Sequence, residues 1–208
     1  TNIENTGTGA TTFQANVVAT NVNVNAGTST FQDNLTAATT TISTGTGNFN
    51  TVSGATTSDL RFTDNGTANL NNGLTGNVTT TADNKGTLNL VGSNNQTVTG
   101  TVGGVGASLA EVNAGVNGST STFANDVYAT NLDVEGTGTV NLDGNFTGTA
   151  IRYNADGTVI LADTKNIDSS VTTTTNNTGT LSLEGSSTVT GQVGASGASL
   201  KEINAGVA

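Results

Sequence analysis

The chain has 208 residues and a net charge of −10, with five basic residues, no cysteine and no histidine. Five basic residues are too few for the basic surface that supplies most of the affinity for nucleic acid, and too few for electrostatic binding to anionic lipid. The missing residue types also exclude disulfide bonds, thiol chemistry and the commonest metal ligand and general base. Abundant Thr, Val, Asn and Gly with no Pro predicts ordered β-structure with tight turns, not disorder.

Residues 1–60 read as short alternating runs separated by small-residue turns. In NVVATNVNVNAG, Val18, Val22 and Val24 all stand at even-numbered positions with Asn between them. Alternate residues of a strand point to the same side, so this pattern predicts a strand with these valines on one side. Phe13, Phe31 and Phe49 recur in similar settings with a period of about 18 residues, which predicts equivalent positions in successive structural units.

Residues 60–105 continue the strand-like pattern. Asn65-Gly66 and Asn72-Gly73, with Asn117-Gly118 further on, predict either hairpin turns or corner turns with positive φ. The stretch ASLAEVNAG is the least strand-like, and a single helical turn remains an alternative there. No run of about 18 apolar residues occurs, so no membrane-spanning helix is expected.

One long unit is followed by a shorter copy of itself. GASLAEVNAGV at 106–116 differs from GASLKEINAGV at 197–207 at only two positions, and we place the long repeat at 11–116 and the shorter copy at 121–207. The offset between equivalent positions is 110 for Phe13 and Phe123 but only 91 for Leu60 and Ile151. The copy has therefore lost about 19 residues, and a solenoid tolerates the loss of a whole coil because each coil contacts only its neighbours.

We therefore predict a single all-β domain over 1–208: a parallel β-helix (β-solenoid), right-handed, with coils of about 18–20 residues. Apolar residues from equivalent positions would stack inside, and Asn side chains at corners would form ladders. The chain begins at Thr1 and ends just after a repeat motif, so we expect it to be a segment of a longer repetitive protein.

The repeat motifs resemble the passenger region of rickettsial autotransporter surface antigens, the outer membrane protein and surface cell antigen family. The resemblance rests on GTLNLVG and TVTGTVGGVGASLAEVNAG in the first copy, GTLSLEG and TVTGQVGASGASLKEINAG in the second, and TFANDVYATNLDV between them. It implies a cell-surface passenger with a β-helix fold that acts in adhesion to and entry into host cells. In the family such a passenger is tethered to an outer-membrane β-barrel, which this sequence does not contain.

Arg61 and Arg152 occupy equivalent positions in the two copies, next to Phe62 and Tyr153. They are the candidate binding residues, for an anion or carbohydrate contact backed by an aromatic ring. The alternative is a solvent-facing arginine whose stem covers apolar surface. Glu111 and Glu202 are also equivalent, and they would either accept a lysine from a partner or satisfy backbone groups of the GASLxE turn.

No catalytic, cofactor-binding or metal-binding residues are predicted. The scattered Asp residues match no calcium-binding loop, and only weak calcium binding at Asp156 or Asp163 stays open. A polysaccharide-cleaving β-helix needs carboxylates and bases clustered in one groove, and the few basic residues provide little for one.

We therefore expect a non-enzymatic segment on the bacterial cell surface, on the extracellular side of the outer membrane, which adheres to host cells as a rigid rod. Its partner would be a host cell-surface protein or glycan; no nucleic acid, no cofactor and no membrane insertion of this segment is expected. The alternative is a structural stalk or spacer with no binding site of its own.

Overall fold

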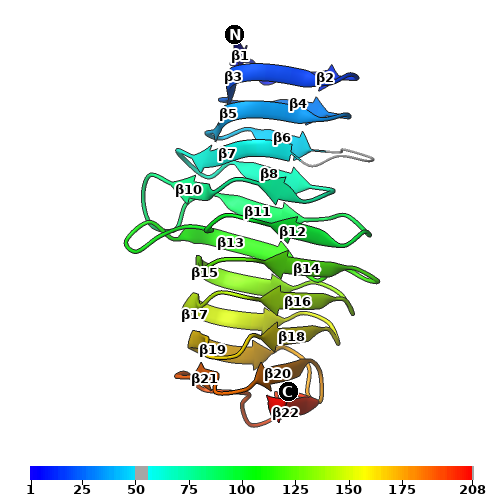
Figure 1. Cartoon of the computed structure of the whole chain (residues 1–208), viewed down its shortest axis with the longest axis vertical. Helices are drawn as coiled ribbons and strands as arrows, with labels where there is room; N and C mark the ends of the chain where they lie inside the picture. The colour runs from blue at the N-terminus through cyan, green and yellow to red at the C-terminus, as the bar shows by residue number, and fades with distance from the viewer. Residues whose placement is uncertain (50–55, 208) are drawn as a thin grey trace.

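Short runs of alternating side chains, interrupted by Gly, Asn and Asp, fold into short strands that wind in coils about one long axis (Figure 1). The computed structural model describes residues 1–49 and 56–207. Within these ranges all regular structure is β-strand or turn. The two ends of the chain lie at opposite ends of the stack.

The strands of the first half are β1 (Asn2–Asn5), β2 (Ala10–Phe13), β3 (Val17–Val24), β4 (Thr28–Phe31), β5 (Leu35–Ile42), β6 (Thr46–Phe49), β7 (Thr56–Phe62), β8 (Thr67–Leu70), β9 (Leu74–Thr75), β10 (Val78–Thr80), β11 (Thr87–Leu90) and β12 (Gln96–Val98). The strands of the second half are β13 (Leu109–Ala114), β14 (Thr120–Phe123), β15 (Val127–Val134), β16 (Thr139–Leu142), β17 (Phe146–Tyr153), β18 (Thr158–Leu161), β19 (Asn166–Thr173), β20 (Thr180–Glu184), β21 (Thr188–Val189) and β22 (Glu202–Val207).

Each strand pairs in parallel with the equivalent strand of the coil before it and the coil after it. Phe13 pairs with Phe31, and Phe31 with Phe49, so the spacing of these phenylalanines is one coil. Later coils are longer, and Thr97 pairs with Thr122. The predicted fold is confirmed: an all-β parallel β-solenoid of about 10 turns with about 20 residues per coil.

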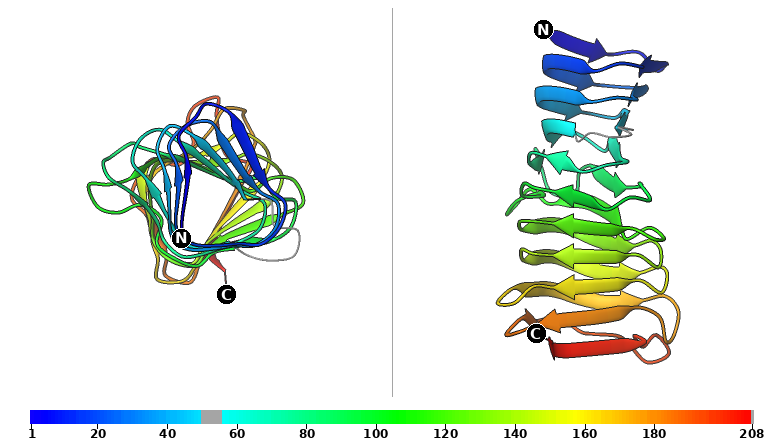
Figure 2. Two further views of the ribbon diagram at one scale, coloured as in Figure 1. Left: turned by 90° about the horizontal axis from the view of Figure 1, so that it is seen from above. Right: turned by 45° about the vertical axis from the view of Figure 1, so that its right-hand side comes forward.

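Each coil has three faces, visible as a three-sided outline from above (Figure 2). Long strands bend over a corner and contribute to two faces: in β3, Val17 and Ala19 point inward before the bend, and Val22 and Val24 after it. Face 1 contains the first part of β3, β5 and β7, then β9, β12, β14, β16, β18, β20 and β22. Face 2 runs from β1 through β10 to β21, and face 3 from β2 through β11 and β13 to the second part of β19.

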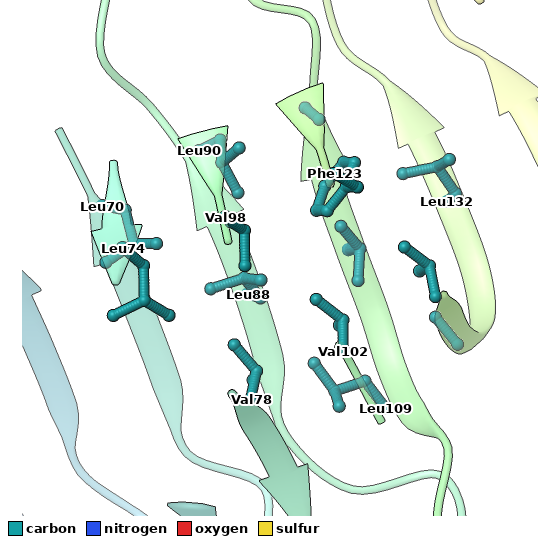
Figure 3. Close-up of a cluster of buried hydrophobic side chains, with 14 of the residues drawn as sticks. Leu70, Leu74, Val78, Leu88, Leu90, Val98, Val102, Leu109, Phe123 and Leu132 are labelled. Carbon is teal, nitrogen blue, oxygen red and sulfur yellow. The ribbon is translucent and has the colours of Figure 1, made fainter. Parts of the chain in front are cut away.

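Columns of apolar side chains fill the interior, one residue per coil. On face 3 the rings of Phe13, Phe31 and Phe49 stack with centroid separations of 5.0 and 5.5 Å. Leu70 and Leu90 continue this column, and Figure 3 shows them among the leucine and valine side chains of neighbouring coils. Each coil alone offers few apolar side chains, so the stacking of coils is what buries them.

Three local predictions need correction. Val18 does not point inward with Val22 and Val24; it is 76% exposed. The inward positions of β3 are odd-numbered up to Ala19 and even-numbered from Val22, because the strand bends between these two residues. The motif GASLAEV forms no helical turn: a tight turn joins Gly104 to Ala107, and β13 follows. The Asn-Gly pairs are corner turns of a parallel coil, and of their glycines only Gly118 has a positive φ among the described residues.

The second copy of the repeat is rotated by one face relative to the first. The equivalent segments 12–24 and 122–134 place their short strand on face 3 (β2) and face 1 (β14), respectively. The offset between the copies is five coils plus one face: β2, β4, β6, β8, β11 and β13 follow one another on face 3, and β14 then lies on face 1. Equivalent surface residues of the two copies therefore point in different directions.

Candidate functional site

Many outward polar side chains are hydrogen-bonded to the coil before or after their own. On face 3, Asn48 Nδ2 donates to Thr30 Oγ1 at 3.2 Å, and the ladder continues through Asn69, Asn89 and Asn113, each donating to the previous Asn Oδ1 at 2.7 Å. At a corner, Asn34 donates to Asn16 Oδ1, which links two coils. The Asn ladder was predicted at corners, and the structure has one such Asn pair at this corner and the longer ladder along face 3. The polar atoms of these side chains are already hydrogen-bonded within the solenoid, so they are poor candidates for binding a partner.

Arg152, one of the two candidate binding residues, forms an ion pair within the chain. On face 3 its guanidinium donates from Nε to Asp133 Oδ1 at 2.6 Å and from Nη2 to Asp133 Oδ2 at 2.5 Å, while Glu111 Oε2 lies 3.8 Å away. The hydrogen bonds that Arg152 donates to Asp133 raise the pKa of Arg152 above its usual value. The Asp133 side chain is buried and the arginine is partly exposed, so this arginine neutralises a carboxylate of its own chain.

Arg61 has no such partner. It lies on face 2 between Thr41 and Thr79, it is exposed, and no ion pair forms with it in residues 1–49 and 56–207. Neither arginine has an aromatic ring beside it at the surface, because strand alternation turns Phe62 and Tyr153 into the core, where both are fully buried. The structure therefore does not bring Arg61 and Arg152 together: they lie on different faces in different coils.

Glu111 and Glu202 do not satisfy the backbone of the GASLxE turn in the part of the chain described. Glu111 Oε1 accepts from Asn113 Nδ2 at 2.9 Å, and its other oxygen faces Arg152. The turn itself is held by Asp83 Oδ1, which accepts from the backbone N–H and the hydroxyl of Ser108, both at 2.8 Å. In the second copy Asn176 Oδ1 accepts the same two bonds from Ser199.

Two of the three lysines are paired with turn carboxylates. Lys85 Nζ lies 2.9 Å from Asp64 Oδ1, and Lys201 Nζ lies 2.6 Å from Asp156 Oδ2. The lysine hydrogen bond is the main cause that holds the pKa of each carboxyl below its usual value. Both pairs are solvent-exposed, so they contribute little to stability.

A groove opens on face 2 beneath the loop between β12 and β13. Its volume is about 310 Å³, and its lining residues come from five successive coils: Asp83, Gly104, Val105, Gly106, Ser108, Tyr128, Thr147, Gly148 and Asp168. The loop overhangs the groove because Gly104 and Ala107 close a tight turn with two mutual hydrogen bonds of 3.0 Å. We call this hollow the Tyr128 groove, since Tyr128 is its one aromatic residue.

Two carboxylates border the Tyr128 groove. Asp83 Oδ1 is bound to Ser108, and Asp168 Oδ1 accepts from Thr190 Oγ1 at 2.7 Å. Among the described residues no hydrogen bond reaches Oδ2 of either carboxylate. The two bonds from Ser108 hold the pKa of the Asp83 carboxyl below its usual value. The groove therefore presents negative charge beside an aromatic ring.

No metal centre is built from the described residues: no three carboxylates converge on one point. Asp156 is occupied by Lys201, and Asp163 Oδ1 accepts from the backbone N–H of Ser186. The described residues also contain no helix of the length and apolarity needed to cross a membrane.

Sequence reasoning missed the Tyr128 groove because its residues are distant in the chain. Comparison of the two copies could have indicated it. Tyr128 of the second copy replaces Val18 of the first, and Asp83 of the first copy replaces Asn176 of the second. These departures from the repeat meet in one groove.

Comparison with protein-family models, with curated proteins and with solved structures gives no match for this chain.

Proposed function

We propose that this chain is a rod-like passenger segment displayed on the bacterial cell surface, where it adheres to host cells through sites on a rigid β-solenoid. The observation that carries the proposal is the uninterrupted parallel stack with cross-coil ladders on its surface. A stack of this kind holds surface groups at fixed positions along its length. The low charge density and the resemblance of the repeats to autotransporter passengers support the same assignment.

The adhesive part of the proposal is supported by one irregular place on an otherwise regular rod. The Tyr128 groove departs from the repeat, has free carboxylate oxygens and lies under a projecting loop. Arg61 adds an exposed cation on the same face, without an ion-pair partner among residues 1–49 and 56–207. A structural stalk needs neither an irregular groove nor an exposed cation, and this favours adhesion over the spacer function.

The test is binding of the labelled 208-residue chain to cultured animal cells, with a β-solenoid of unrelated sequence as the control. Saturable binding that the unlabelled chain competes away supports an adhesive segment. Binding no greater than that of the control overturns adhesion and leaves the spacer function, in which the rod only holds another segment away from the membrane.

A further inference from the structure

The turn after β10 and the loop before β13 project beyond the strands at the left of Figure 1. They are tied together, because Asn84 N–H donates to the Ser108 carbonyl oxygen at 2.9 Å. Asn84 Oδ1 also accepts from Thr130 Oγ1 at 3.1 Å, which anchors the turn two coils further on. Two projecting segments thus form a fixed overhang above the Tyr128 groove.

The groove is matched to a ligand rich in hydrogen-bond donors. Oδ2 of Asp83 and Oδ2 of Asp168 can only accept, whereas the hydroxyls of Tyr128 and Thr147 can donate or accept. No Lys or Arg is among its described lining residues, so neither carboxylate charge is neutralised within the groove. Ammonium and guanidinium groups carry only donors and a positive charge, and they therefore suit these carboxylates.

The aromatic wall points to the same class of ligand. Tyr128 forms part of the lining, and a cation over the face of a tyrosine is attracted by the ring quadrupole. Pockets for small molecules begin at about 300 Å³, so a groove of about 310 Å³ is large enough to hold one long side chain.

We propose that the Tyr128 groove binds one basic side chain, lysine or arginine, of a protein partner. The aliphatic stem lies against Tyr128, and the charged end lies beside one of the two carboxylates, Asp83 at one end of the groove or Asp168 at the other. This proposal deepens the adhesive function and depends on it for its biological setting, but the binding itself is testable without cells.

The test is an NMR titration of the isotopically labelled 208-residue chain with acetyl-lysine methylamide and acetyl-arginine methylamide. We expect saturable shifts at Gly104, Tyr128 and Asp168. We expect none with Nε-acetyl-lysine methylamide, which has the same stem and no charge. Saturable groove shifts with the neutral probe or with maltotriose, and none with the cations, would overturn the proposal.

The two copies supply the variants. Asp83→Asn keeps the turn, since Asn176 makes the same bonds in the second copy, and it should weaken binding about twofold to fivefold. Tyr128→Val introduces the residue of the first copy and should weaken binding about twofold to tenfold. The control is Asp143→Asn, an exposed carboxylate outside the groove with the same change in charge. An equal loss for Asp143→Asn would mean non-specific attraction and would refute the proposal.

The two proposals fail separately. Cell binding that survives Asp83→Asn and Tyr128→Val refutes the groove and leaves adhesion standing. Groove shifts with the cationic probes and no binding to cells refute adhesion and leave the groove standing.

Discussion

Asn113 on β13 and Asp133 on β15 lie opposite each other on face 3, and the hydrogen-bond ladder is interrupted between them. Asn113 Nδ2 donates to Asn89, but its buried Oδ1 has no partner. An ionised carboxylate has no donor for that oxygen, and Asp133 instead accepts from Arg152 in the next coil. The amide ladder of the first copy therefore gives way to an ion pair where the second copy begins.

The ion pair has a testable energetic consequence. Arg152→Ala leaves the carboxylate of Asp133 buried without a cation, and we expect a loss of about 1–3 kcal/mol in stability, below the fully buried range because Arg152 is partly exposed. The double variant Asp133→Asn/Arg152→Asn extends the amide ladder and should be close to the wild type in stability. Urea unfolding followed by circular dichroism measures both, and a double variant as unstable as Arg152→Ala would contradict this account.

A second interruption of a ladder can be repaired by one substitution. On face 1, Asn141 Nδ2 donates to Thr122 Oγ1, but its buried Oδ1 faces Ile160 in the next coil and has no partner. Ile160→Asn supplies a donor for that oxygen, as Asn69 does for Asn48 on face 3. Because an unsatisfied buried acceptor costs about 1–3 kcal/mol, we expect Ile160→Asn to be at least about 1 kcal/mol more stable than Ile160→Asp, its donor-free isostere. Equal thermal midpoints of the two variants would refute the explanation.

The coil was predictable from the sequence because its signals are local and repeated. The regular spacing of Phe13, Phe31 and Phe49 indicated the coil length, and the difference between the two repeat offsets marked one removable coil. The rotation of the second copy was not predicted, because it depends on the lengths of the coils between the copies, which vary along the chain, and the motif GASLAEV did not read as a strand.

The candidate site was less predictable for a physical reason. Arg61 and Arg152 are equivalent in sequence, yet their surroundings are set by the preceding coil, which places Asp133 beside Arg152 and Thr41 beside Arg61. The Tyr128 groove combines residues as far apart as Asp83 and Asp168. Such neighbours follow from the length of each coil, which varies along the chain.

One glycine is required by the packing of an aromatic ring. Gly86 has a φ of 78°, and a Cβ there would lie 2.2 Å from the ring of Phe62. Strained backbone and overpacking each cost about 1–3 kcal/mol, so we expect Gly86→Ala to lower stability by at least about 2 kcal/mol. Gly104→Ala is the control, because no atom lies within 4 Å of its Cβ position. Similar losses for the two variants in thermal unfolding would exclude ring packing as the cause.

Stability should fall in acid. Asp64, Asp83 and Asp156 have pKa values below the ordinary 3.8 in the folded chain, chiefly because of hydrogen bonds from Lys85, Ser108 and Lys201, respectively. A lowered pKa in the folded state gives stability that is present above about pH 4 and is lost as the pH falls through the folded value. Thermal midpoints measured from pH 6 to pH 2 should therefore decline below pH 4. The decline should be smaller in Asp83→Asn, and an unchanged decline would assign the effect to other carboxylates.

A whole coil should be removable without loss of the fold. Val17 pairs with Leu35 and Ala10 with Thr28, so deletion of residues 17–34 removes one complete coil and joins equivalent corner positions, Asn16 to Leu35. β5 then pairs with β1, and Phe13 stacks on Phe49, because every inward position is kept in register. We expect a folded rod that is shorter by one strand spacing, about 4.8 Å, in solution scattering.

The matched control is deletion of residues 26–34, half of the same coil, which forces β5 from faces 1 and 2 onto face 3. It should unfold the N-terminal coils, because the inward side chains of β5 then meet the wrong columns. If the whole-coil deletion were as disruptive as the half-coil deletion, the coils would not be the independent nearest-neighbour units from which the solenoid is built.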